Sequence, residues 1–215
     1  MNQIKEEIKQ YIERNVFTEY EKNEQGHGIE HIKYVIRRSF ELIEQNDLEV
    51  NHNLVYVIAA YHDIGHHIDA KNHEKVSAEI MSKDKNLEQF FSVEELKIIK
   101  EAIEDHRASS KTDPRSIYGK IVSSADRNNT VEQCLERTYS YGKEHTPDAT
   151  DSELYERAYD VLNKKFGYNG YAKFYFKDRE YEKFLQDIRD LLEDKENFYK
   201  VQENYIKGLN KRWEW

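Results

Sequence analysis

The sequence predicts an all-α fold, and three observations support this prediction. Apolar residues recur at intervals of three and four along much of the 215-residue chain, as they do on the buried face of a helix. Only two prolines and eight glycines occur, so few residues interrupt helices or form tight turns. Charged residues make up 35% of the chain and the residues AVILMFWYC only 38%, so the apolar positions must be used efficiently.

The expected helices of the first third follow one another closely. An amphipathic helix spans Ile4–Ile12, the segment Gly26–Gly28 interrupts the pattern, and a second helix runs over Ile29–Ile43. Residues 54–61 are apolar on nearly every side. Eight such residues also suit a buried strand, but their helical neighbours favour a central buried helix.

The middle of the chain predicts three more helices. A short one begins at Ser77, and Ser92–Glu95 has the pattern of a capping box that starts the next. The apolar stripe from Tyr118 to Ala125 predicts a helix that continues towards Leu135.

Beyond Pro147 the composition shifts to tyrosine, phenylalanine and charged residues. Residues 166–171 are expected to form a loop, and residues 184–192 carry the last amphipathic stripe. We therefore predict a helical domain over residues 1–145. A helical extension over residues 146–215 is expected to pack on that domain or to complete it.

Composition also excludes several classes of protein. The net charge of −9 argues against a chain that binds nucleic-acid duplexes, because such proteins need a basic surface. The single cysteine, Cys134, cannot form an internal disulfide and fits a reducing compartment. No signal-peptide pattern and no run of about 20 apolar residues is present. We expect a cytoplasmic protein without a membrane partner, and its oligomeric state stays open.

Histidine and aspartate recur on the apolar stripes. His31, the pair His62-Asp63, His106 and Asp126 each lie on an apolar stripe or at its end. Singly, each suggests a hydrogen-bonded core histidine, or a capping or ion-paired aspartate. Because the stripes of one domain face one core, we expect the five side chains to converge. Imidazole and carboxylate ligands suit Mn, Fe or Zn, and the absence of nearby cysteine argues against a structural zinc site.

These residues resemble the ordered pattern of the HD superfamily of metal-dependent phosphohydrolases. The matching segments, over about residues 20–130, are HGIEHIKYV, AAYHDIGHH and IVSSADRNN. The resemblance implies an HD-domain helical bundle in which His31, His62, Asp63 and Asp126 hold a divalent ion. The opening motif and the size are most similar to small bacterial HD hydrolases. One departure is that Tyr34-Val35 stands where the family has Arg-Val.

The resemblance also assigns expected roles to further residues. The divalent ion is Mn, Fe, Mg, Co, Ni or Zn, with one ion expected and two as the alternative. His73 and His106 match the segments that bind a second ion in binuclear members, and otherwise contact phosphate. His66 stands where many members carry a lysine near the attacking water, and is a candidate proton carrier or phosphate contact.

Three residues are weaker candidates for substrate contacts. Arg107 follows His106 and Arg127 follows Asp126, so each guanidinium is a candidate to bind a phosphate group through two hydrogen bonds. Charged residues, however, usually lie on a solvated face. His27 lies one helical turn before His31, and is otherwise a loop residue.

The function implied by the resemblance is hydrolysis of a nucleotide or another small phosphate ester or anhydride by metal-activated water. In that reaction Asp63 binds the ion and orients the nucleophile. Two alternatives stay open: a diiron oxygenase built on the same scaffold, and a non-catalytic module that binds nucleotide or metal. No motif identifies the substrate.

Overall fold

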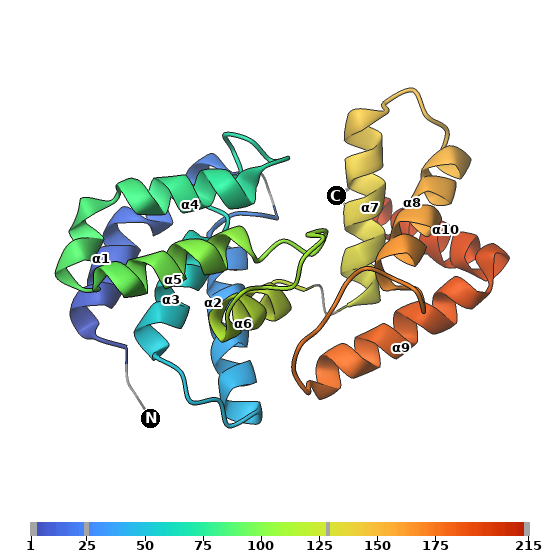
Figure 1. The fold of residues 1–215 in the computed structure, drawn as a ribbon. Helices are drawn as coiled ribbons and strands as arrows, with labels where there is room; N and C mark the ends of the chain where they lie inside the picture. Colours follow the sequence, from blue (N-terminus) through green and yellow to red (C-terminus); the bar gives the residue numbers. More distant parts are fainter. Residues whose placement is uncertain (1–3, 24–25, 128–129, 213–215) are drawn as a thin grey trace. The chain divides into compact units, whose positions relative to one another are not determined.

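The computed structural model describes residues 4–23, 26–127 and 130–212, and these form helices and turns without any β-strand. The all-α prediction is therefore confirmed for the described chain. Contacts divide the chain into two compact units, drawn in Figure 1. The first comprises the residues up to Arg127 together with Phe174–Lys177, and the second comprises the remainder. Within the described ranges, none of the helices is both long and apolar enough to span a bilayer.

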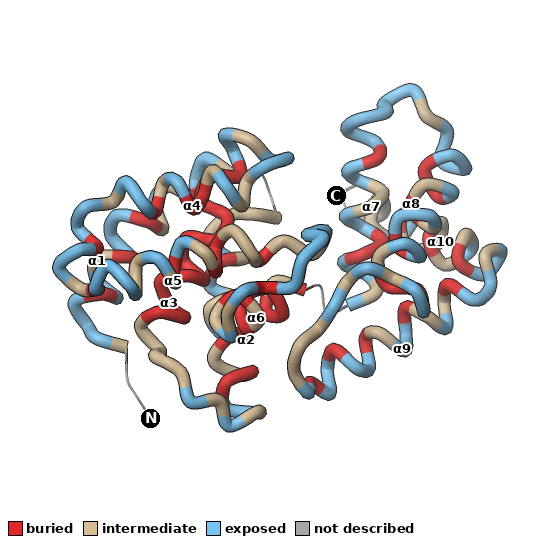
Figure 2. The backbone as a smooth tube through the Cα atoms, viewed as in Figure 1, coloured by how far each residue is buried: buried red, intermediate tan, exposed pale blue. Residues whose placement is uncertain are grey.

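The first unit is built around one buried helix, α3, which contacts α1, α2, α4, α5 and α6. Residues 54–61 of α3 are each at most 4% exposed, and Figure 2 shows this helix as buried. The prediction of a central buried helix is confirmed. The elements of this unit are α1 (Glu6–Asn15), η1 (Phe17–Lys22), α2 (Ile29–Gln45), α3 (His52–Tyr61), α4 (His73–Lys83), η2 (Lys85–Gln89), α5 (Val93–Glu104) and α6 (Ile117–Ala125).

Two predicted helix boundaries were wrong. Helix α4 begins at His73, four residues before the predicted start at Ser77. The predicted single helix from Tyr118 towards Leu135 is two helices, because α6 ends at Ala125 and a new helix begins at Val131. Thr130 caps that new helix by accepting a hydrogen bond from a backbone N–H of its first turn.

The second unit is a bundle of α7 (Val131–His145), α8 (Asp151–Phe166), α9 (Arg179–Glu193) and α10 (Lys195–Arg212). Aliphatic and aromatic side chains share its interior; the ring centroids of Phe166 and Phe184, for example, lie 5.0 Å apart in an edge-to-face contact. The observed division at Arg127 and the predicted domain boundary at residue 145 differ by one helix, because α7 packs against α8, α9 and α10. The assignment of functional domains stays a prediction.

Residues 174–177 belong to the first unit although the helices on either side of them belong to the second. Phe174 and Phe176 pack against the apolar core of the first unit, and the backbone N–H of Tyr175 donates to Ser124. This segment therefore contributes side chains to a core that is otherwise formed by residues before Arg127.

Candidate metal centre

A tight turn after α3 presents the His62-Asp63 pair. His62 keeps helical backbone angles (φ −55°, ψ −35°) at the C-terminal end of the buried helix. Gly65 follows in the turn, where a Cβ atom would lie 2.7 Å from a side-chain carbon of Val76 and 2.9 Å from the backbone nitrogen of Ser77. The Gly65 N–H donates to Ser77 Oγ at 3.0 Å. Glycine at this position therefore lets α4 approach closely and fix the turn.

The first ligand group consists of His31, His62, Asp63 and Asp126, which the structure brings together from α2, the end of α3 and the end of α6. His31 Nε2 lies 3.1 Å from Asp126 Oδ1 and 3.6 Å from Asp63 Oδ2. His62 Nε2 lies 3.5 Å from Asp63 Oδ2 and 3.9 Å from Asp126 Oδ1. The sequence prediction that these side chains converge agrees with this geometry, while their role as ligands stays a prediction.

The donor atoms of the first ligand group fit a divalent cation. Nε2 of His31 and Nε2 of His62 are buried without a hydrogen-bond partner, an unfavourable state that a bound cation relieves. His62 Nδ1 donates to the Ala59 carbonyl at 2.8 Å, which leaves the Nε2 lone pair for an ion. Ligands at first-row metal distances lie about 3–3.7 Å from one another, close to the separations observed.

The second ligand group consists of His73, His106 and the other oxygen of Asp63. His73 Nε2 and His106 Nε2 each lie 3.4 Å from Asp63 Oδ1 and 3.1 Å from one another. Both rings donate Nδ1–H to backbone carbonyls, those of Ala70 and Ile103. When both rings are neutral, three acceptor atoms therefore face one point. The two oxygens of Asp63 thus serve two different ligand groups.

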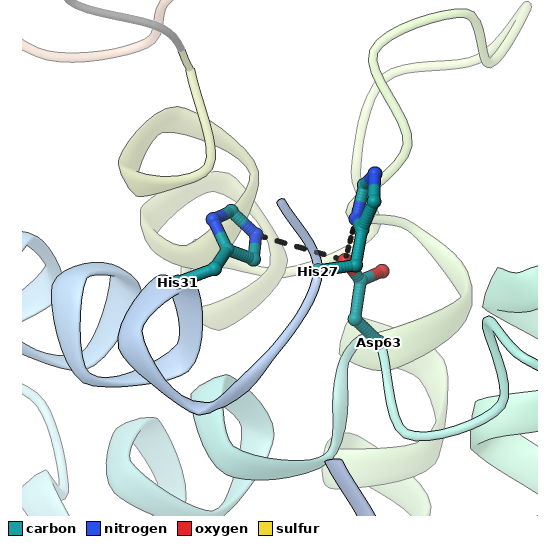
Figure 3. A group of neighbouring side chains, drawn as sticks. All are labelled: His27, His31 and Asp63. Carbon is teal, nitrogen blue, oxygen red and sulfur yellow. Dashed lines mark hydrogen bonds and ion pairs between the residues drawn. The ribbon is translucent and has the colours of Figure 1, made fainter. Parts of the chain in front are cut away.

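His27 and His66 lie against the first ligand group. His27 Nδ1 donates to Asp63 Oδ2 at 2.8 Å, and Figure 3 shows His27 and His31 both directed at this carboxylate. His27 also stacks on His66, with ring centroids 3.8 Å apart. From the sequence, His27 was expected to contact substrate or to be a loop residue. Its contact with Asp63 makes it a partner of the carboxylate, which the HGIEH spacing could have indicated, while a contact with substrate stays a prediction.

Burial and neighbouring charges set the protonation states of the first ligand group. Burial lowers the pKa of His62 to about 4. Burial raises the pKa of Asp63, but the charge of His62 and hydrogen bonds from histidines outweigh it, so the net pKa lies well below the usual range. The pKa of Asp126 is also lowered, because His31 outweighs the effect of burial. Ionised carboxylates and a neutral imidazole are the states that bind metal ions.

The other two buried histidines differ from one another. Burial lowers the pKa of His66 to about 4. Burial also acts to lower the pKa of His106, but its hydrogen bond to Asp63 outweighs this and raises the pKa. A proton on His106 therefore competes with any cation bound at the second ligand group.

The two candidate arginines have protein partners. Arg107 donates to Glu74 Oε2 at 3.1 Å and to the carbonyl of Lys71. Arg127 is 3% exposed, and its Nη2 donates to Ser123 Oγ at 2.9 Å. Their proposed contacts with substrate stay predictions.

One further residue was missed by the sequence analysis. The Asn23 side chain donates to the backbone carbonyls of His27 and Asp63, at 2.9 and 3.0 Å, and accepts from the N–H of His67 at 3.0 Å. It joins the segment before α2 to the turn after α3. Nothing in the sequence distinguishes this asparagine from an ordinary surface residue, because its role depends on contacts about 40 residues away.

The comparisons with known proteins agree with this fold. A protein-family model, that of the HD domain, matches residues 28–129. The crystal structure of a predicted HD superfamily hydrolase from an uncultured Thermotogales bacterium is similar, with a TM-score of 0.50 and 18% sequence identity, over 96% of this chain and 91% of that chain. No curated protein matches. The matched residues include both ligand groups, and residues 28–129 are therefore identified as an HD domain.

Proposed function

We propose that this protein is a metal-dependent phosphohydrolase that acts on a nucleotide or another small phosphate ester or anhydride. One observation carries the proposal: the Asp63 carboxylate lies between two groups of imidazole and carboxylate ligands, with one oxygen directed at each. The description of the structural relative as a predicted HD superfamily hydrolase supports the reaction class. The choice of a phosphate substrate rests on the resemblance of the motifs.

The first ligand group would hold one divalent ion, and the second ligand group a further ion that shares Asp63. When bound, such ions supply Lewis acidity and make water a stronger nucleophile at neutral pH. Asp126 contributes a second negative charge to the first ligand group only. We therefore assign the tighter ion to the first ligand group and the weaker one to the second.

Asp63 acts as a ligand and an orienting group rather than as an acid. Its pKa lies well below the usual carboxyl range, so it carries no proton to donate at neutral pH. His27 donates to Asp63 Oδ2, and this hydrogen bond restrains the orientation of the carboxylate. Both oxygens are thereby held towards their ligand groups.

His66 is our candidate proton acceptor. Its side chain is 8% exposed and stacks on His27, and its ring centroid lies 5.2 Å from that of His73. The pKa of His66 is lowered to about 4, so the ring is neutral at pH 7, the state that a general base needs. The same low pKa makes it a weak base, so its contribution is modest.

The experiment that tests the proposal combines metal analysis with a screen for activity. The purified protein is analysed for bound metals, stripped with a chelator and reloaded with Mn, Mg, Co, Fe, Ni or Zn. Phosphate release is then measured over nucleotides and phosphomonoesters. Wild type should release phosphate only when reloaded, Asp126→Asn should not, and His145→Gln, which changes an exposed histidine of the second unit, should match wild type.

Other outcomes contradict the proposal in distinct ways. Bound iron with oxygen uptake and no phosphate release would indicate the oxygenase alternative. Binding of nucleotide or metal without turnover of any substrate would indicate a non-catalytic module. Equal phosphate release by wild type and Asp126→Asn would show that the activity does not arise at this site.

A further inference from the structure

An ion pair lies beside the second ligand group. Glu74 follows His73 in the sequence, and Arg107 follows His106. Arg107 Nη1 lies 3.1 Å from Glu74 Oε2, and the same nitrogen donates to the backbone carbonyl of Lys71. The Glu74 side chain is 13% exposed and that of Arg107 is 33% exposed. The pair therefore joins the same two chain segments that meet in the contact between the histidines.

With both rings neutral, the contact between His73 and His106 is not stabilising by itself. Each ring donates its Nδ1–H to a backbone carbonyl, so both Nε2 atoms present lone pairs to one another and to Asp63 Oδ1. Acceptors that face each other at such distances repel unless a proton or a metal ion lies between them. While neither a proton nor a metal ion occupies that point, other interactions must hold the two rings together.

The backbone at this position also needs support. His73 is the first residue of α4, and His106 lies just beyond the end of α5. The ends of helices lack part of their backbone hydrogen bonds and open more readily than helix interiors. Residues 69–72, which precede His73, form turns and lie largely at the surface.

We infer that Glu74 and Arg107 are positioning residues that hold His73 against His106 in the ion-free protein and so form the second cation site in advance. Arginine suits this task because its planar guanidinium can donate to a carboxylate and a carbonyl at once. Glu74 also lies in the first turn of α4, where a negative charge interacts favourably with the helix N-terminus. The consequence for a second ion rests on the proposed function, whereas the consequence for the histidine contact does not.

A matched control is available at the same end of α5. Arg115 makes ion pairs with Glu101, Glu104 and Asp105, all of which lie on α5 or at its C-cap. Its side chain is 46% exposed. Arg115→Gln therefore removes charge from the same helix end without removing a contact between the segments that carry His73 and His106.

The test uses two single variants, Arg107→Gln and Glu74→Gln, and one double variant in which the two residues are exchanged, Glu74→Arg with Arg107→Glu. Wild type and Arg115→Gln are the controls. The first readout is the nuclear Overhauser effect between ring protons of His73 and His106, measured on histidine-labelled full-length protein in chelator. It should be lost in both single variants, recovered in part by the exchange, and kept in Arg115→Gln.

The second readout is a Mn²⁺ titration that resolves the two ions. We expect the Kd of the weaker ion to rise about 10- to 100-fold in Arg107→Gln, as is typical when the residues that orient metal ligands are removed. The Kd of the tighter ion should not change. A general loss of structure would weaken both ions, so the selective effect distinguishes positioning from folding.

Three results would overturn the inference: a ring-proton signal that persists in Arg107→Gln, no such signal in wild type, or an equal loss in Arg115→Gln. A wild-type protein that binds one ion, but whose histidine contact depends on Arg107, supports the positioning role and contradicts the second ion of the proposed function. The two failures are therefore distinguishable.

Discussion

The two ligand groups that share Asp63 are built from different kinds of structure. The first takes His62 from the end of the buried α3 and His31 and Asp126 from α2 and the end of α6, which pack against α3; it includes a second carboxylate. The second takes His73 and His106 from the start of one helix and just beyond the end of another, and its only carboxylate is Asp63. The difference teaches that the second carboxylate and the helical supports of the first group favour cation binding there. At the second group, the positions of the two histidines depend on contacts at the helix ends.

The largest effect is expected from Asp63→Asn, because this substitution acts on both ligand groups at once. The asparagine keeps the size of the side chain but removes the negative charge and one of the two oxygen ligands. We predict that metal-dependent phosphate release is abolished, since the loss of a ligand that also orients the nucleophile costs orders of magnitude in rate. Circular dichroism should show an unchanged helical fold.

A suitable control is Asp148→Asn, which changes an exposed aspartate in the second unit by the same chemistry. It should retain wild-type phosphate release. If Asp63→Asn hydrolysed substrate at nearly the wild-type rate with matched metal content, neither ligand group would need the carboxylate, and the comparison between them would lose its basis.

A smaller effect is expected from His106→Ala, which acts on the second ligand group alone. We predict that turnover falls more than binding of the first ion, because the first ligand group keeps all four of its side chains. Metal content and phosphate release are measured on the same preparation, and His73→Ala serves as a second test of the same group. An equal loss of bound metal and activity would show instead that the two groups bind ions only as a coupled pair.

Much of the first ligand group could be predicted from the sequence because its members lie on regular structure. His31 is spaced in register with the buried apolar residues of α2, and Asp126 with those of α6. Helical periodicity alone therefore places both on inward faces. The second ligand group was harder to place because His73 precedes the apolar stripe of its helix. Sequence periodicity assigned the start of α4 to Ser77, and only the structure shows that the helix begins at His73.

Other features depend on contacts between distant parts of the chain. The bonds of Asn23 to the turn after α3 and the ion pair between Glu74 and Arg107 leave no periodic pattern. The phosphate contact of Arg107 stays a prediction, but its position beside His106 in the sequence did not indicate that its side chain pairs with Glu74. The placement of Phe174 and Phe176 in the core of the first unit is of the same kind.

A still smaller effect is expected from His66→Ala, since His66 belongs to neither ligand group. We predict a fall of about 10²-fold in turnover, the scale of assistance by one proton-transfer residue. Because the ring stacks on His27, part of the loss reflects the altered support of that residue. Bound metal should stay at the wild-type level. A variant that lost metal as readily as His106→Ala would make His66 a ligand and so extend the second group.

The smallest effect is expected in the pH dependence of stability, where His62 and His66 should act in the opposite direction to His106 in chelator-treated protein. Burial lowers the pKa of His62 and His66 from 6.5 to about 4. Between these values the unfolded chain binds more protons than the folded chain, so the free energy of unfolding decreases as pH falls from 6.5 to 4. Asp63 and Asp126, whose folded pKa values are lowered, add a further loss at still lower pH.

His106 should have the reverse effect. Burial lowers its pKa, but the hydrogen bond to Asp63 outweighs this and raises it, so its contribution is complete below pH 6.5 and is lost as pH rises through the folded value. Urea unfolding from pH 4 to 8 measures both effects. His66→Gln should reduce the change in the free energy of unfolding below pH 6.5, and His106→Gln should reduce the change above pH 6.5. If both variants changed stability over the same pH range, His66 and His106 would not have opposite protonation behaviour, because each substitution removes one of the two titrating rings.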